Sequence, residues 1–382
     1  MTQEELLKVS NLLSKARLLG GDSKVMTDWY VIERGKYETI VYFGPLITDD
    51  MNPMIPRRFK SEALFRENDK RQKVTVIGGE NLSDISNLFA GLFLSELDIS
   101  EFKPKNLVNT AGLFYHSHID KVTGFDSLDT HKVEKMSWMF EGSVIKDIDI
   151  SRLNTYSVTD MTDMFRESII ENLDFSNFNT SKVTTMTGMF ASVRCKKLDI
   201  SNFDTAAVRT MIDMFSESKI DELNISWANT ASLRLTNGMF YKIRTNKLDL
   251  SAMDTFNVTD MSRMFFGACV PKINLSSFIT SEVTSMREMF QACRTKELNL
   301  SNFDTSRVKD MSKMFMWANI QKLDISSFHA TELKKTEVNG MFYKCNVQKL
   351  RISDVLKRYT SAKNEELPKF FDMEVVKIPM RN

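Results

Sequence analysis

The 382-residue sequence predicts an α/β fold: a right-handed solenoid with a parallel strand ladder of about eleven coils, capped at both ends. Self-similarity is the first observation, because Met-Phe, or Leu-Phe early in the chain, recurs with its Phe at intervals of 25 to 27 residues between positions 89 and 342. The second is that every unit joins a strand-like alternation to a wider apolar spacing. Repeats of this length are typical of solenoids, in which each coil contacts only its neighbours.

The repeat also explains an unusual composition of 24 Met and 27 Phe against 7 Pro. The best copies follow the pattern L-D-I-S-N-F-D-T-S-x-V-x-x-M-x-x-M-F, as in LNLSNFDTSRVKDMSKMF at 298–315. Nine Met residues directly precede the recurring Phe, and seven stand four positions before it. Most of the Met and Phe enrichment therefore belongs to one copied motif.

Each unit is expected to contain a short strand, a turn and a short helix. In Leu198 to Ser201 apolar and polar residues alternate, which is the strand pattern. Asp204 and Thr205 supply turn and N-cap chemistry. The apolar residues Val208, Met211, Met214 and Phe215 are spaced i, i+3, i+6, i+7, which predicts one apolar stripe on a helix or a tight 3₁₀-like coil.

One unit cannot bury its own apolar stripe, so the units are expected to stack. Consecutive strands then form a parallel ladder with about 4.8 Å between neighbours. A right-handed connection is expected because parallel crossovers almost always have that hand. Phe supplies a large buried area, and unbranched Met fills uneven gaps between coils.

The LDLSNFDTS-type strands followed by VTDMSxMF segments resemble the BspA-like leucine-rich repeat proteins. The resemblance covers residues 72–353 and implies that this part is a leucine-rich-repeat solenoid. Many BspA-like proteins are bacterial or protist surface adhesins. Similar repeats occur in intracellular proteins of large DNA viruses and protists. The resemblance therefore implies a binding role and leaves the cellular location open.

The flanks are expected to cap the solenoid. Residues 1–71 predict an α+β cap or a separate accessory module: a helix over 6–19, two strands in TDWYVIERG and YETIVYFG, and a helix in RRFKSEALFREND. Gln72 to Gly79 is expected to be a first, atypical strand, and Leu350 to Ser353 the last one. Residues 354–382 are expected to form a C-terminal cap, because open solenoid ends need a cover.

Strand alternation places one polar column on the outer face of the sheet, and this column is the candidate partner-binding site. Lysines two positions earlier in their own strands are expected to offset the repulsion between stacked carboxylates. A solvated, charge-compensated face is the alternative interpretation. The candidate residues are Asp149, Asp174, Asp199, Asn224, Asp249, Asn274, Asn299 and Asp324, with Lys197, Lys247, Lys272 and Lys322.

The other polar columns have structural explanations. Seven-fold Ser and Thr columns, such as Ser201 and Thr205, are expected to bond turn backbone in successive coils rather than act as nucleophiles. Cys269, Cys293 and Cys345 take a position filled elsewhere by Ala or Ser and are expected to be small core residues. The four histidines have no spacing that supports a metal site. No catalytic residue, cofactor or metal is expected.

These observations favour a non-catalytic scaffold for protein–protein interaction. The 51 basic and 50 acidic residues nearly cancel, which removes the electrostatic argument for nucleic acid. No apolar run approaches the roughly 18 residues of a membrane helix. The start of the chain does not resemble a secretory signal, so a cytoplasmic location is expected, with virion-associated or cell-surface roles as alternatives. Structural assembly, including self-association through the caps, is the second functional hypothesis.

Overall fold

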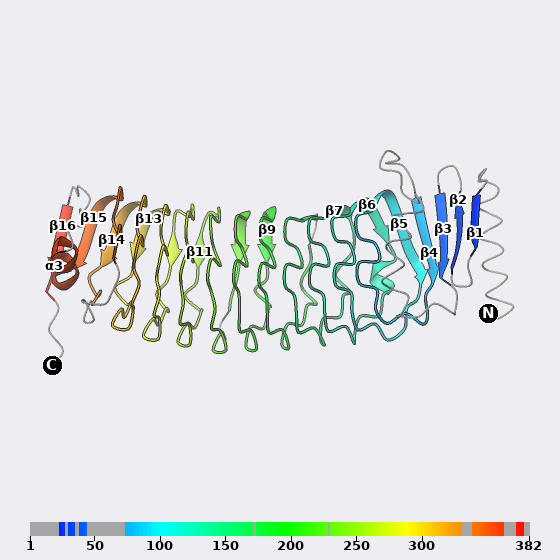
Figure 1. The fold of residues 1–382 in the computed structure, drawn as a ribbon, viewed down its shortest axis with the longest axis horizontal. Coiled ribbons are helices and arrows are strands. Elements are labelled where there is room, and N and C mark those ends of the chain that lie inside the picture. Colours follow the sequence, from blue (N-terminus) through cyan, green and yellow to red (C-terminus); the bar gives the residue numbers. More distant parts are fainter. Residues whose placement is uncertain are drawn as a thin grey trace. The chain divides into compact units, whose positions relative to one another are not determined.

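The structure is a computed structural model that describes residues 23–26, 30–34, 38–43, 73–170, 173–227, 229–329, 338–362 and 372–377. The chain divides into two compact units, Met1–Thr180 and Ser181–Asn382. Each unit is a stack of coils that run through a strand, a polar corner and a second corner around the recurring Phe (Figure 1).

Unit 1 has one sheet whose strands follow chain order. The first three strands pair in antiparallel fashion, and from β3 onward every pair is parallel. The strands are β1 (Ser23–Met26), β2 (Tyr30–Arg34), β3 (Glu38–Phe43), β4 (Lys73–Gly78), β5 (Phe93–Phe102), β6 (His118–Thr123), β7 (Val144–Asp147) and β8 (Ile169–Ile170).

Unit 2 has three parallel sheets, β10-β9, β11-β12 and β13-β14-β15-β16. Residues paired in register are mostly 25 positions apart, as in Leu198 with Leu223. The strands are β9 (Arg194–Asp199), β10 (Lys219–Asn224), β11 (Leu248–Asp249), β12 (Ile273–Asn274), β13 (Arg294–Asn299), β14 (Asn319–Ile325), β15 (Asn346–Ser353) and β16 (Asp372–Val376). The predicted parallel-strand solenoid of about eleven turns is confirmed.

The described parts of the flanks contain the expected strands together with two that were not expected, β1 and β16, so the strand at Leu350 to Ser353 is not the last one as predicted. The segments TDWYVIERG and YETIVYFG contain β2 and β3, and the first atypical strand is β4. The expected helices over 6–19 and in RRFKSEALFREND lie outside the described residues. After β15 the chain forms helix α3 (Asp354–Ala362), and β16 pairs in parallel with β15.

A column of stacked Phe rings forms the centre of the core. In unit 2, Phe190, Phe215, Phe240 and Phe265 are fully buried, and neighbouring ring centroids lie 5.5–5.8 Å apart. Their ring planes differ by only 4–10°, so one coil repeats the side-chain conformation of the last. The sixteen Met residues of the two Met columns are also fully buried. The expected core is therefore present.

The prediction of a short helix in each 25-residue repeat is wrong. Among the described residues, helical structure is confined to α3 and one 3₁₀ turn, η2 (Phe125–Ser127). The reason is a pair of left-handed residues in every coil, two positions before and two positions after the recurring Phe. The first left-handed column is Asn87, Gly112, Trp138, Asp163, Gly188, Asp213, Gly238, Arg263, Glu288, Lys313 and Gly340, and the second is Gly91, His116, Gly142, Glu167, Ser192, Glu217, Lys242, Gly267, Ala292, Trp317 and Lys344.

Positive φ at these positions redirects the backbone hydrogen bonds. The N–H groups of Trp138 and Phe140 each donate to a carbonyl of the next coil at 2.9 Å. The N–H groups of Met139 and Glu141 instead donate to carbonyls three residues earlier in their own coil, at 3.3 and 3.1 Å. A helix would use every N–H within one coil. This alternation instead joins neighbouring coils and still turns Val, Met and Phe inward.

The Thr column also links coils, as expected. Thr255 Oγ1 donates to the Ile279 carbonyl at 2.8 Å, and the Ile279 N–H donates back to Thr255 Oγ1 at 2.9 Å. Thr280 makes the same pair of bonds with Asp304, at 2.9 and 2.8 Å. Each hydroxyl thus satisfies both backbone groups of a corner residue in the next coil, which explains why a buried polar residue recurs there.

The Phe column generates a stability prediction. Phe215→Ala should lower the free energy of unfolding by roughly 3–5 kcal/mol, because it removes a ring that contacts rings of both neighbouring coils. Urea unfolding of the full chain followed by circular dichroism measures the loss. The matched control is Phe256→Ala, since Phe256 is half exposed. A loss below about 1 kcal/mol for Phe215→Ala would show that this column is not a close-packed core.

Candidate functional site

The candidate site is the outward face of the strands in unit 2. In every strand-bearing coil of this unit two consecutive residues are exposed between buried or half-buried neighbours, which departs from the strict alternation expected. We call these pairs the strand face. They are Lys196 and Lys197, Asp221 and Glu222, Asn246 and Lys247, Pro271 and Lys272, Lys296 and Glu297, Gln321 and Lys322, and Gln348 and Lys349.

The strand face is charged and mixed in sign. Lys197 lies opposite Glu222 in the strand register, and Glu297 lies opposite Lys322. Opposite charges at neighbouring positions of a sheet are mildly stabilising. Because these side chains are outside the core, their identity can change from coil to coil without altering the fold.

In unit 2 the aspartate and asparagine column lies beside the strand face, at or next to the last residue of each strand. Asp149 and Asp174 belong to unit 1 and lie outside its strands. Of the eight predicted residues, five are exposed and three are half-buried. The exposed members are Asp149, Asp174, Asp199, Asn224 and Asn299, and the half-buried ones are Asp249, Asn274 and Asp324.

The first task of this column is structural. The side-chain oxygen of Asp249 accepts a hydrogen bond from the Ser251 hydroxyl at 2.7 Å and one from the Ser251 N–H at 3.3 Å. Asn299 accepts the Ser301 N–H in the same way at 3.0 Å. This is an Asx turn, which Asp and Asn form equally well. The Ser column therefore bonds the aspartate of its own coil, whereas the sequence analysis expected successive coils.

Side chains of neighbouring coils donate hydrogen bonds to the carboxylates, either from asparagine amides or from an arginine. Asparagine amides donate to the aspartate of the preceding coil, Asn224 to Asp199 and Asn274 to Asp249, each at 3.0 Å. At the end of the column, Arg351 donates to Asp324 at 2.7 Å. The expected repulsion between stacked carboxylates is thus reduced by interspersed amides as much as by lysine.

The predicted lysines contribute unequally. Lys247 lies 3.0 Å from the Asp249 carboxylate, and Lys197 lies 3.9 Å from that of Asp199. Lys272 and Lys322 form no ion pair among the described residues, and the strand of Lys272 has Asn274 where others have Asp. Relief of carboxylate repulsion by lysine is therefore confined to two of the four predicted residues.

Hydrogen bonding sets the ionisation of the column. The Ser251 hydroxyl, and then the Lys247 ammonium, lower the pKa of Asp249 to about 2. The Asn224 amide and the Ser201 hydroxyl lower the pKa of Asp199. The column is thus anionic at neutral pH, with its charges held in fixed positions.

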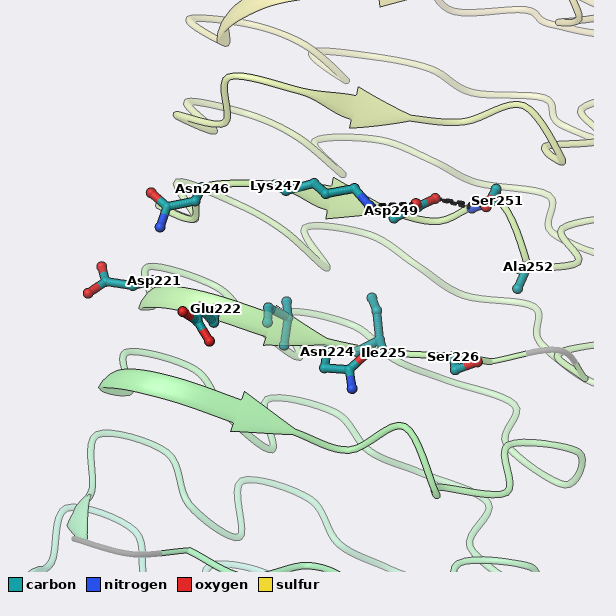
Figure 2. Close-up of a pocket in the computed structure, with 11 residues that line it drawn as sticks. Asp221, Glu222, Asn224, Ile225, Ser226, Asn246, Lys247, Asp249, Ser251 and Ala252 are labelled. Carbon is teal, nitrogen blue, oxygen red and sulfur yellow. Dashed lines mark hydrogen bonds and ion pairs between the residues drawn. The ribbon is translucent and has the colours of Figure 1, made fainter.

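A groove opens where the strand ladder is interrupted. Strand β10 pairs with β9 and β11 with β12. Strand β10 is joined to the following coil by the Lys219–Arg244 bridge and by two long bonds to the Asp221 carbonyl, from the Asn246 N–H at 3.3 Å and from the Thr245 hydroxyl at 3.5 Å. The groove has a volume of about 450 Å³. Figure 2 shows Lys247, Asp249 and Ser251 along one wall, and Asp221, Glu222 and Asn224 along the other.

The cysteines and histidines do not build a second site. Cys293 and Cys345 are buried, and burial raises the pKa of each thiol to about 12. Cys269 is exposed, so its assignment to the core was wrong. Within the described ranges, no group of three or more His, Cys, Asp and Glu side chains could hold a metal ion.

Asp249 generates a pH prediction. Because its pKa is lower in the folded chain than the roughly 3.9 of a free aspartate, its ionised form stabilises the fold above that value, and this contribution disappears as pH falls toward 2. Asp249→Asn retains an acceptor for the Ser251 turn and lacks the charge. We expect it to cost less than about 1 kcal/mol at neutral pH, since the carboxylate is partly exposed.

The test compares urea unfolding midpoints of both chains at neutral pH and at about pH 2.5. The wild type should lose more stability on acidification than Asp249→Asn does. An equal loss in the two chains would contradict the assigned role of this carboxylate.

Comparison with known proteins agrees with the repeat architecture. No curated protein and no solved structure matches the chain, and no helix in the described part of the chain is long and apolar enough to cross a membrane. A family described as Mycoplasma protein of unknown function, DUF285, matches four overlapping segments, residues 60–143, 114–227, 170–270 and 234–355. These segments span most of the chain and the whole of its repeat, and the chain belongs to this family.

Proposed function

We propose that this protein is a non-catalytic scaffold for protein–protein interaction and that its strand face binds the partner. The supporting observation is the pair of consecutive exposed residues in each coil of unit 2. Where these strands pair in parallel, as β9 with β10 and β13 with β14 and β15, the backbone of the pairs is held in place, so little conformational entropy is lost on binding. An extended surface of variable side chains on a repeated frame is the usual recognition surface of solenoids.

The absence of a catalytic role is part of the proposal. The recurring hydroxyls, which are the most numerous nucleophile candidates, bond turns: Ser251 its own Asp249, and Thr255 the backbone of the next coil. The buried thiols of Cys293 and Cys345 are kept protonated by their raised pKa. Neither group is placed to attack a substrate.

The finer assignments belong to the same proposal. We assign the coils to the BspA-like leucine-rich repeat type on the sequence pattern LDLSNFDTS followed by VTDMSxMF. The expected right-handed connection and the capping role of residues 1–71 and 354–382 stay predictions. A cytoplasmic location also stays a prediction, with virion-associated and cell-surface roles as the alternatives.

The test removes charge from the strand face and from the adjoining aspartate column without disturbing the turns. The variant combines Lys197→Gln, Asp199→Asn, Lys247→Gln and Asp249→Asn, because Asn retains the turn acceptor that a charge reversal would lose. We expect recovery of the partner from a lysate of the source cells to fall at least about tenfold, as each lost charge pair across an interface weakens binding. Quantitative mass spectrometry of the captured proteins measures the change.

A matched control neutralises four charges outside the strand face, three of them exposed and the fourth, Glu282, half-buried. It combines Arg209→Gln, Asp204→Asn, Lys309→Gln and Glu282→Gln, and it should capture the partner as the wild type does. Urea unfolding must show that both variants are fully folded under the conditions of capture. Unchanged capture by the strand-face variant would remove this surface from the proposal.

Assembly through the chain ends is a second candidate, and strand β16 favours it. Met373 and Val375 lie in register with the buried Leu350 and Ile352 of β15 and thus continue two core columns. On β16, the last strand of its sheet, these side chains are 37% and 40% exposed. Apolar side chains at a sheet end favour contact with another chain.

Light scattering tests this second candidate. The weight-average mass should rise with concentration above the 44.0 kDa of one chain, and the double variant Met373→Ser, Val375→Ser should suppress the rise. Glu374→Gln, in the same strand, is the control and should behave as the wild type. A constant mass of one chain for the wild type would refute assembly.

A further inference from the structure

Unit 1 contains a pocket at the corner around the recurring Phe, away from the strands. Its volume is about 600 Å³, and it is lined by Asn87, Tyr115, Trp138, Glu141, Asp163, Arg166 and Glu167. These residues come from four successive coils. They occupy the two left-handed columns and the position directly after the Phe. They therefore all lie at the corner around the recurring Phe.

A glycine lets Asn87 take its place in the pocket lining. In the first left-handed column, Gly112 stands between Asn87 and Trp138 and has φ +64°. A Cβ atom at this position would lie 2.3 Å from Asn87 Oδ1, so the space that a side chain would take is occupied by the Asn87 amide. A larger residue at position 112 would displace Asn87 and change the pocket.

The charges in the pocket do not balance. Glu141, Asp163 and Glu167 face a single cation, Arg166, at N···O distances of 3.9, 3.5 and 3.5 Å. Charge-assisted hydrogen bonds between such groups are about 2.7–2.9 Å long, so no carboxylate is closely paired. The Glu141 side chain is only 17% exposed. Desolvation, and then repulsion by Asp163, raise its pKa, which is the response of a carboxylate that has too little positive charge nearby.

Two aromatic side chains lie beside these carboxylates. Tyr115 and Trp138 are 38% and 46% exposed, although both are large and mostly apolar. Trp138 has φ 57°, a conformation that is uncommon for a bulky residue and that Gly adopts at four other coils of the same column. Aromatic faces attract cations, and the attraction grows when the cation is desolvated.

The geometry points to a binding site for a lysine side chain of a protein partner, with the ammonium among the three carboxylates and the alkyl stem against Tyr115 and Trp138. An ammonium has three donors for the loosely paired oxygens, and its charge reduces the excess of negative charge in the pocket from two to one. This site goes beyond the strand-face function proposed above, and it can fail or hold independently of it.

A second corner pocket provides an internal comparison. In unit 2 a pocket of about 510 Å³ lies beside Gly238, which has φ +61° in the same left-handed column. Its charged lining is Asp213 with Arg263 and Arg287. Both arginines pair closely with Glu288, at 2.7 and 3.2 Å, whereas the carboxylates of the unit 1 pocket have only longer contacts with Arg166. The same backbone thus forms pockets with different charged linings.

The experiment uses the full chain labelled with 5-fluorotryptophan. The sequence has four Trp, and the fluorine signals of Trp138 and Trp317 are assigned by their loss in Trp138→Gly and Trp317→Gly. Both substitutions place Gly at a left-handed position, which favours correct folding. The probe is the peptide acetyl-GSKGSKGSK-amide, and the matched control peptide has Gln in place of each Lys.

Titration of the lysine peptide should shift the Trp138 signal and leave the Trp317 signal in place. Glu141→Gln should weaken binding about tenfold, because it removes the most buried carboxylate of the site. The control Glu217→Gln, at the position of unit 2 that corresponds to Glu167, should leave the affinity unchanged. A Trp138 shift of the same size with the Gln peptide, a general shift of all four signals, or wild-type affinity in Glu141→Gln would each overturn the proposal.

Discussion

Hydrogen bonds between the backbones of successive coils, made outside the strands, are the constraint on which the rest of this structure depends. At the corner around the recurring Phe, alternate N–H groups such as those of Trp138 and Phe140 donate to the next coil. This is possible because two residues of each corner adopt left-handed conformations. Since the bonds keep adjacent coils at one spacing, Phe rings, Thr hydroxyls and Asx turns repeat in register along each unit.

The repeat, the strands and the buried columns could be predicted from the sequence because a 25-residue period is visible in the letters themselves. The corner could not. A helix suits the spacing of Val208, Met211, Met214 and Phe215. The same spacing also directs these side chains into the core when left-handed residues separate short turns. A signal was present, since Gly, Asn or Asp stands two positions before the Phe in seven coils. The remaining coils have other residue types at this position, which concealed the signal: Trp138, Arg263, Glu288 and Lys313.

The candidate site was predictable to a similar depth. Alternation placed Asp199 and Asp249 outward, and the pairing of Lys247 with Asp249 followed from their spacing. The commitment of these carboxylates to Asx turns was missed, although Asp followed two residues later by Ser is a recognisable local signal. The consecutive exposed residues of the strand face were also missed, although two polar letters between apolar ones mark them in the sequence, as in Ile320 to Leu323. The groove near Asn246 depends on interrupted pairing between coils.

The two left-handed columns separate the fold from its surface chemistry. A non-glycine residue in this conformation costs about 1 kcal/mol or more, yet the structure tolerates sixteen residues other than Gly at positive φ. The bonds between coils and the stacked core offset that cost, and the side chains at these positions range from the exposed Trp138 to the buried Glu288. The same backbone forms a corner pocket in each unit, and the lining differs because these side chains differ. One pocket has Trp138 and Glu141, and the other has Arg263 and Arg287 paired with Glu288, so the two differ in what they can bind although their coils are built alike.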